Sequence, residues 1–239
     1  MTPTRRSREP VRADATSFPS PETSLTVLLV LTAAGLFVLP LIPVRSVWID
    51  GFLTLQIVAA LAVVLGVRVL RFIAAVIALA AVMSLWSPQF GSEMAHLMWR
   101  LASRLVLIVL VTTVIAYRAF APGRVTMHRI GGAVLLYLLA GIAFSLIYQL
   151  MAARDPGAFS GVMPAAGDTL AALRSYGDQF TYYSFMTLTT VGYGDISPLR
   201  QDARTLATCE ALVGQLYPVI MLARLVSLHV MRESSRRPD

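Results

Sequence analysis

The sequence predicts an all-α integral membrane protein with six spanning helices, and three observations carry this prediction. The chain of 239 residues is 56% hydrophobic and only 14% charged, with a mean hydropathy of +0.69. A soluble domain usually carries about a quarter charged residues. The apolar residues fall into six segments, each near the roughly 20 residues that a helix needs to cross a membrane. Helix is the expected form, because a backbone in lipid must satisfy its own hydrogen bonds.

The segments follow a polar start. Residues 1–23 hold four arginines and four prolines and have no apolar pattern, so we expect a disordered, basic cytoplasmic tail. A cleaved signal peptide is the alternative, but the first apolar stretch is too long for one and has no clear cleavage motif. The six apolar segments cover residues 25–43, 48–67, 69–86, 97–117, 130–151 and 206–230.

The charges predict the orientation of these helices. Arginines cluster at 5–12, 68–71, 118–129 and 232–237, which are all on one side if the helices cross in turn. This is the bias expected of the cytoplasmic side, so both termini are predicted to be cytoplasmic. The three tryptophans then fall at the outer ends of segments, as in an interfacial aromatic belt. We therefore expect a multi-pass protein of the cell inner or plasma membrane.

Several function classes are disfavoured by the same composition. The net charge of +7 comes from arginines spread between apolar segments, which is unlike the basic patch of a nucleic-acid-binding protein. The single cysteine, Cys209, allows no disulfide within the chain. No nucleophile–base pair, paired carboxylates or nucleotide motif is present, so we expect neither an enzyme nor a cofactor.

The segment with the most chemical information lies between the fifth and sixth apolar segments. Residues 152–178 read as a loop, and residues 179–189 as a short helix that dips into the membrane and stops. The hexapeptide 190–195, Thr-Val-Gly-Tyr-Gly-Asp, follows directly. A dehydrated cation such as potassium needs several backbone carbonyls that point the same way. Gly192 and Gly194, at alternate positions, can take the left-handed backbone that this requires.

The neighbouring residues complete this interpretation. The hydroxyl of Thr190 adds an oxygen at the inner end. Val191 and Tyr193 are expected to point away from the ion path, and Tyr183 on the short helix is placed to support them from behind. The negative end of the short helix faces the ion path and favours a cation.

In these residues the chain resembles the potassium channels. Their signature matches Thr189 to Asp195, and it stands here between a re-entrant helix and a final apolar helix. The resemblance covers about residues 130–230. It implies a homotetramer in the lipid bilayer with a voltage-gated-like layout, in which a four-helix module at 24–120 precedes a pore domain at 126–232.

The resemblance also implies roles for single residues. The potassium ions would be coordinated by filter oxygens of Thr190, Val191, Gly192 and Tyr193, with Gly194 completing the filter, and Thr189 and Asp195 supporting it. Gly214 matches the position of an inner-helix hinge, and Pro218 can kink the same helix by removing one backbone bond.

Two departures from the family pattern limit what it implies. Met186 stands where some bacterial channels carry a glutamate that pairs with the aspartate after the filter. In the fourth segment only Arg100 and Arg104 are charged, too few for a steep response to voltage. We expect them to anchor the outer end of the helix, and we predict no strong voltage sensor.

Glu210 leaves two interpretations open. An acid inside a membrane segment is a candidate functional residue. It either lies behind the filter, bonded to the short helix, or faces outer water.

The sequence thus predicts a channel that conducts potassium passively. The alternative is a non-conducting regulatory or assembly subunit of another membrane complex. A complete filter argues against it, because a silent subunit has no need of both glycines and the threonine.

Overall fold

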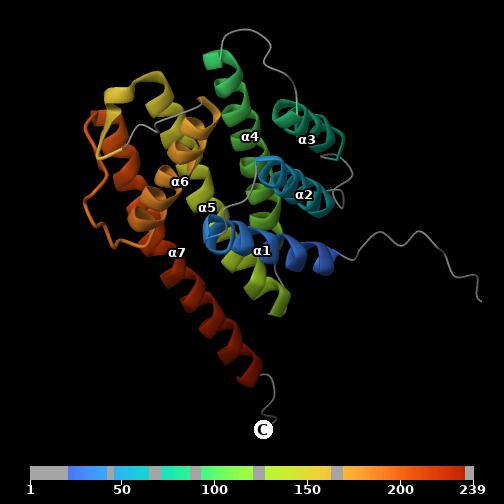
Figure 1. Ribbon diagram of the computed structural model, residues 1–239. Helices are drawn as coiled ribbons and strands as arrows, with labels where there is room; N and C mark the ends of the chain where they lie inside the picture. The colour runs from blue at the N-terminus through green and yellow to red at the C-terminus, as the bar shows by residue number, and fades with distance from the viewer. Residues whose placement is uncertain are drawn as a thin grey trace, which may run out of the picture.

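The computed structural model describes residues 21–41, 46–64, 71–86, 93–120, 127–162 and 169–234. Over these residues the protein is almost entirely helical (Figure 1). The long helices are α1 (Pro21–Phe37), α2 (Ser46–Val64), α3 (Arg71–Trp86), α4 (Glu93–Phe120), α5 (Met127–Arg154), α6 (Thr169–Leu188) and α7 (Gln201–Ser234). The short elements are η1 (Leu39–Leu41), η2 (Pro156–Ala158), β1 (Phe159–Ser160) and β2 (Ser197–Pro198).

The described part of each of the six apolar segments lies largely in a helix, and α6 is the additional helix between the last two. Four stretches within the described residues are long and apolar enough to cross a membrane: 24–41, 94–117, 130–154 and 201–224. The apolar stretch found in α2 covers only 51–61, and α3 has 16 residues, so the count of six spans stays a prediction. The mostly helical, membrane-spanning character follows directly from these stretches.

The starts of α6 and α1 differ from the sequence-based expectation. The helix α6 begins at Thr169, whereas residues 152–178 were expected to be a loop; its first turns contain Leu and Ala, which favour helix. The helix α1 begins at Pro21, inside the expected tail of 1–23, and proline suits a first helical turn. The rest of that tail lies outside the described residues.

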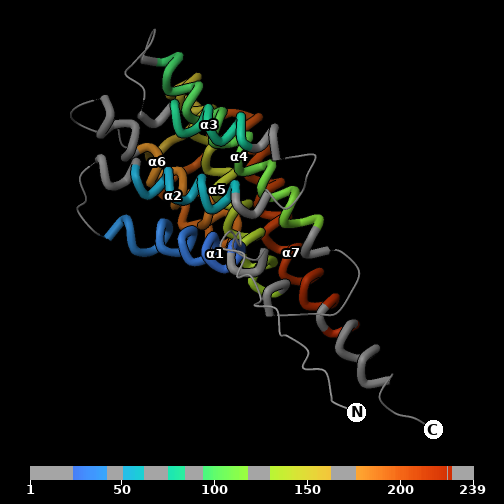
Figure 2. Tube along the Cα trace, turned by 90° about the vertical axis from the view of Figure 1, so that its right-hand side faces the viewer, coloured from blue at the N-terminus to red at the C-terminus, as the bar shows by residue number. Residues whose placement is uncertain are grey.

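The first core lies among α1 to α5. The helix α4 packs along α5, α1 lies across α5, and α2 and α3 complete the group (Figures 1 and 2). Its buried centre includes Leu28 of α1, Val111 and Ile115 of α4, and Leu135 of α5. The hydroxyl of Thr32 in α1 accepts a hydrogen bond from Gln56 of α2, at 3.3 Å. One continuous apolar core therefore ties the first four helices to α5.

A second core lies between α5, α6 and the start of α7. It is built from aromatic rings: Tyr148 of α5, Phe159 of β1, and Phe180 and Tyr183 of α6. Neighbouring ring centroids lie 5.0 to 5.7 Å apart in edge-to-face pairs, which adds to the gain from burial. The strands β1 and β2 pair antiparallel beside it, with Phe159 opposite Pro198. The loop between α6 and α7 is thus held on its own rigid core.

The two cores share α5, whose earlier turns enter the first and whose later turns enter the second. The helix α7 packs on α5 and α6 with its first half, while its second half extends beyond the other helices in both views (Figures 1 and 2). The division into modules at 24–120 and 126–232 stays a prediction.

Replacing Phe180 with Ala should destabilise the protein strongly, because this side chain is fully buried in the aromatic core. Loss of a buried Phe typically costs about 3–5 kcal/mol. Thermal unfolding in detergent measures the effect. The control is Phe37→Ala in α1, where the ring is 64% exposed and a much smaller change is expected. Equal shifts for both variants would contradict the proposed role of this core.

Candidate ion-coordinating site

The loop between α6 and α7 alternates in backbone handedness. Gly192 has a φ of 54° and Gly194 a φ of 80°, so the left-handed state expected at these glycines is confirmed. Thr190 joins the same alternate series with a φ of 60°. A β-branched residue rarely adopts this conformation, and such strain persists only where the surroundings enforce it. The residues between, Val191 and Tyr193, are not left-handed, so the alternation runs from 190 to 194.

The amides of the loop show which way its carbonyls face. The amide groups of Val191 and Gly192 both donate to the carbonyl of Met186, at 2.9 and 3.1 Å. In a planar trans peptide the C=O points opposite to the N–H of the same unit. The carbonyls of Thr190 and Val191 therefore both point away from α6. Two successive carbonyls on one side are what an ordinary strand cannot supply and what coordination of a cation requires.

The end of α6 is satisfied by this loop. The last four carbonyls of a helix lack partners within the helix. Here Phe185, Met186 and Thr187 accept from loop amides at 2.9 to 3.1 Å. The carbonyl of Leu188 accepts from the hydroxyl of Tyr137 in α5 at 3.2 Å. Helix and loop thus fix one another, which explains how a strained backbone is held.

The aromatic residues near the loop divide into two groups. The ring of Tyr182 stacks on that of Tyr193, with centroids 6.4 Å apart and planes at 7°. Tyr183, which we expected behind the loop, lies within one chain in the aromatic core, 5.0 Å from the ring of Tyr148. The two side chains face different neighbours because consecutive residues on an α-helix are about 100° apart around its axis. Within one chain the support for Tyr193 therefore comes from Tyr182.

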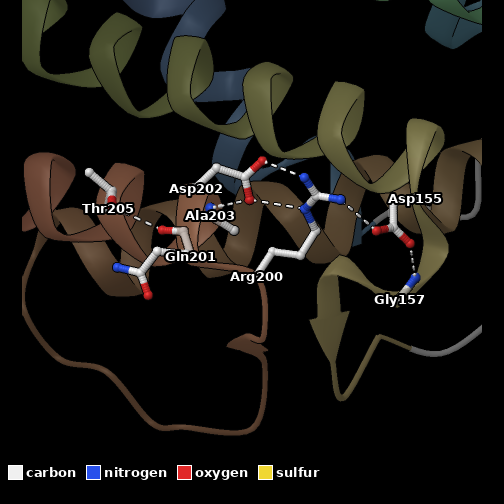
Figure 3. A network of polar contacts seen from close by, with 7 residues as sticks. All are labelled: Asp155, Gly157, Arg200, Gln201, Asp202, Ala203 and Thr205. Carbon is white, nitrogen blue, oxygen red and sulfur yellow. Dashed lines mark hydrogen bonds and ion pairs between the residues drawn. The ribbon is translucent and has the colours of Figure 1, made fainter.

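The end of the loop next to α7 is fixed by polar contacts, drawn in Figure 3. The guanidinium of Arg200 donates to Asp155 at 2.9 Å and to both carboxylate oxygens of Asp202 at 3.0 Å. Asp155 also accepts from the amide of Gly157 at 3.0 Å. These bonds join the end of α5 to the start of α7. The guanidinium of Arg200 and the amide of Gly157 lower the pKa of the Asp155 carboxyl, so the contact stays ionised well into the acid range.

A backbone contact supports the same end. Gly161 has a φ of 78°, and a Cβ there would lie 1.8 Å from the carbonyl oxygen of Asp195. The segment after β1 therefore touches the backbone of the loop directly after Gly194. Asp195 itself is exposed within one chain.

Glu210 is fully buried, which decides between its two interpretations. One carboxylate oxygen lies 2.6 Å from the hydroxyl of Tyr148 in α5, and the other contacts the hydroxyl of Ser184 in α6. Glu210 therefore lies behind the loop, bonded to the short helix, and does not face outer water. This acid joins α5, α6 and α7 at one point.

Gly214 stands one turn further along α7, at the closest approach of α7 to α6. A Cβ at this position would lie 1.7 Å from the carbonyl oxygen of Leu188. Pro218 lies inside α7, and its missing amide is the one that would bond the carbonyl of Gly214. The two candidate hinge residues thus bracket one missing helix bond. The hinge stays a prediction, and close packing is a second reason for a glycine here.

The sequence missed the partners that depend on tertiary contact. These are Tyr137, Tyr148, Tyr182 and Ser184, together with the salt bridges of Arg200 to Asp155 and Asp202. The usable signals were Tyr137 and Tyr148, which are polar groups in an apolar segment. Of the residues on α4, Arg100 and Arg104 are both half-buried.

Comparison with known proteins finds a family model and two relatives that match this part of the chain. The family model described as ion channel matches residues 133–230, which include α6, the loop and most of α7. The chain is 31% identical over 122 residues to the protein LctB of Bacillus caldotenax, which covers 51% of this chain and 87% of that protein. It is 35% identical over 86 residues to LctB of Geobacillus stearothermophilus, which covers 36% of this chain and 60% of that protein. No solved structure matches the chain.

Gly214→Ala should separate α7 from α6 and lower the thermal midpoint in detergent, because the new Cβ has no space. Gly132→Ala in α5 is the matched control, since its Cβ would lie in ordinary contact, 3.9 Å from Ile115. A pure hinge role predicts the reverse for Gly214→Ala, with unchanged stability and altered opening. An unchanged midpoint would therefore contradict the packing role.

Proposed function

This chain belongs to the ion channel family, and from that premise we propose that it is a potassium-selective channel. The proposal is that potassium passes down its electrochemical gradient along the backbone of residues 190–194, which act as the selectivity filter. Each ion would exchange its water for carbonyl oxygens of Thr190, Val191, Gly192 and Tyr193, and for the hydroxyl of Thr190. Such a row of backbone oxygens is the means by which potassium filters replace hydration.

One observation carries this proposal. The left-handed states at Thr190, Gly192 and Gly194 occur together with the shared bond of two amides to Met186. This combination turns successive carbonyls to one side. A loop with only a structural role has no need for a strained threonine between an α-helix and two glycines.

A fourfold arrangement is part of the proposal, because one loop supplies oxygens on one side of an ion only. Within one chain, Val191 is 51% exposed and Tyr193 is 71% exposed. The face of α7 that continues below the loop is also apolar and exposed, at Leu212, Leu216, Val219 and Ile220. Three further copies of the chain would cover these residues and close the filter around an axis.

The helix α6 would be re-entrant in this arrangement. It has 20 residues but is not among the stretches apolar enough to span, within the described part of the chain. Its C-terminal end would direct a negative potential at the ion path. With Arg100 and Arg104 as the only charges in the span of α4, strong voltage gating is not part of the proposal.

Gly192→Ala should abolish selective potassium flux without preventing membrane insertion. A Cβ disfavours the left-handed state by about 1–2 kcal/mol in each subunit, and four subunits would bear the strain together. Flux of potassium and sodium into liposomes measures the effect. Gly51→Ala in α2 is the control, because a Cβ there has open space. Undiminished selective flux through Gly192→Ala would count against the filter.

The oligomeric state tests the same proposal against the rival of a silent subunit. Purified protein should form a homotetramer in mild detergent, as measured by native mass spectrometry. Leu216→Asn on the exposed face of α7 should shift the protein to smaller species, because a buried amide would lack partners. Leu79→Asn in α3, equally exposed within one chain, should leave the tetramer intact. An obligate complex with another protein would favour the rival.

A further inference from the structure

Glu210 is the one fully buried acid among the described residues, and the proposed filter does not use its charge. Among the described residues, no positively charged side chain bonds to it. The hydrogen bonds that it makes in the described part of the chain involve the hydroxyls of Tyr148 and Ser184 alone. The other titratable groups that act on this site are Tyr137 of α5, Tyr183 of α6 and Cys209 of α7. None of these side chains can carry a positive charge, so an ionised Glu210 would be an unpaired buried charge, which is very costly.

A count of hydrogens around Ser184 gives an independent indication of the state of Glu210. The hydroxyl of Ser184 contacts two oxygens: a carboxyl oxygen of Glu210, and the carbonyl of Gly141 in α5 at 2.7 Å. A hydroxyl has one hydrogen to donate, and a backbone carbonyl has none. If Glu210 were ionised, one of the two contacts would be a pair of oxygens without a hydrogen between them.

A proton on Glu210 removes this conflict. The carboxyl then supplies the hydrogen for its contact with Ser184, and Ser184 donates to the carbonyl of Gly141. Tyr148 donates to the other carboxyl oxygen at 2.6 Å. Three contacts between oxygens are then served by three hydrogens. The bonds form one chain that starts on α5, passes through α7 and α6, and returns to α5.

The position of Ser184 connects this chain to the filter. Ser184 lies four residues before Leu188, the last residue of α6, on the turn that leads to Met186. Met186 provides the carbonyl that orients Val191 and Gly192. A change in how Ser184 is held therefore moves the group that orients the filter backbone. Gly214, one turn below Glu210, brings α7 against the end of the same helix.

We propose that Glu210 acts as a neutral carboxylic acid, a positioning residue that holds α6, and through it the filter, against α5 and α7. Its effect on potassium selectivity rests on the proposed channel function. Its protonation does not, because the hydrogen count and the burial are properties of one chain. The two parts of the proposal are therefore tested by different measurements.

Infrared spectroscopy of the full-length protein at neutral pH tests the protonation. We expect a carbonyl stretch of a protonated carboxyl that is present in the wild type and lost in Glu210→Gln. Asp178→Asn, which replaces an exposed acid on α6, is the control and should keep the band. A wild-type spectrum that contains only ionised carboxylates overturns the proposal, whether or not the protein conducts.

The positioning role is tested by the ratio of potassium to sodium flux in liposomes. An amide can accept from Tyr148 and donate to Ser184, so Glu210→Gln should keep the wild-type ratio within about twofold. Glu210→Leu, which has similar size and no polar atoms, should lower the ratio by about tenfold or more, because Tyr148 and Ser184 lose their partner. Ser184→Ala should lower it in the same direction and covers the case in which Glu210→Leu fails to fold.

The pH dependence separates a positioning role from a purely structural one. Alkaline pH that removes the proton from Glu210 should reduce selectivity in the wild type and leave Glu210→Gln unaffected. A Gln variant that loses selectivity, or Leu and Ala variants that keep it, would overturn the role of Glu210. If the wild type itself does not select potassium while the infrared band is present, the channel function fails and the protonation stands.

Discussion

The geometry of the candidate filter depends on one acceptor, the carbonyl of Met186 at the end of α6. A polypeptide can present successive carbonyls to one side only if the matching amides are satisfied on the other side, because each peptide unit is planar and trans. The amides of Val191 and Gly192 meet this requirement by sharing that carbonyl. The last carbonyls of a helix have no partner within the helix. Here they accept hydrogen bonds from the amides of the following loop and so set the direction of its backbone. The left-handed states at 190, 192 and 194 follow from these bonds.

The contacts of α6 with α5 and α7 keep the end of α6 in place. The aromatic core lies on one side of α6. The carbonyl of Leu188, the last residue of α6, accepts a hydrogen bond from Tyr137 of α5. Because Gly214 has no side chain, the backbone of α7 lies directly against the carbonyl of Leu188. At the outer end, Arg200 links the end of α5 to the start of α7. These contacts differ in chemistry, but each of them opposes a shift of α6 relative to α5 or α7.

The first four helices, α1 to α4, pack with α5 in the apolar core and contribute no described residue to the aromatic core beside α6. The family match covers residues 133–230, and α1 to α4 lie outside it. They join the rest of the chain through the apolar core on α5, where Leu135, Leu136 and Leu139 are buried against them. Residues on the outer faces of these helices are apolar and exposed, among them Val58, Val76, Leu79 and Val109, as expected of surfaces that meet lipid. In this arrangement α5 is the element through which any movement of the first four helices would reach α6.

The sequence by itself determined the helical membrane class, the apolar segments and the two glycines of the candidate filter. These features are local: hydropathy is a property of consecutive residues, and Gly192 and Gly194 are free to be left-handed whatever surrounds them. It also located Glu210 as an acid in an apolar segment, without deciding where it faces.

Tertiary structure alone decided that Glu210 is buried against Tyr148 and Ser184, and that Tyr182 contacts Tyr193. It also decided that Thr190 is left-handed, because a threonine takes that state only when the surrounding structure enforces it. The physical reason is common to these cases. A polar side chain in an apolar helix can be satisfied by many partners, and only the packing of α5, α6 and α7 selects which of them lies within hydrogen-bond distance.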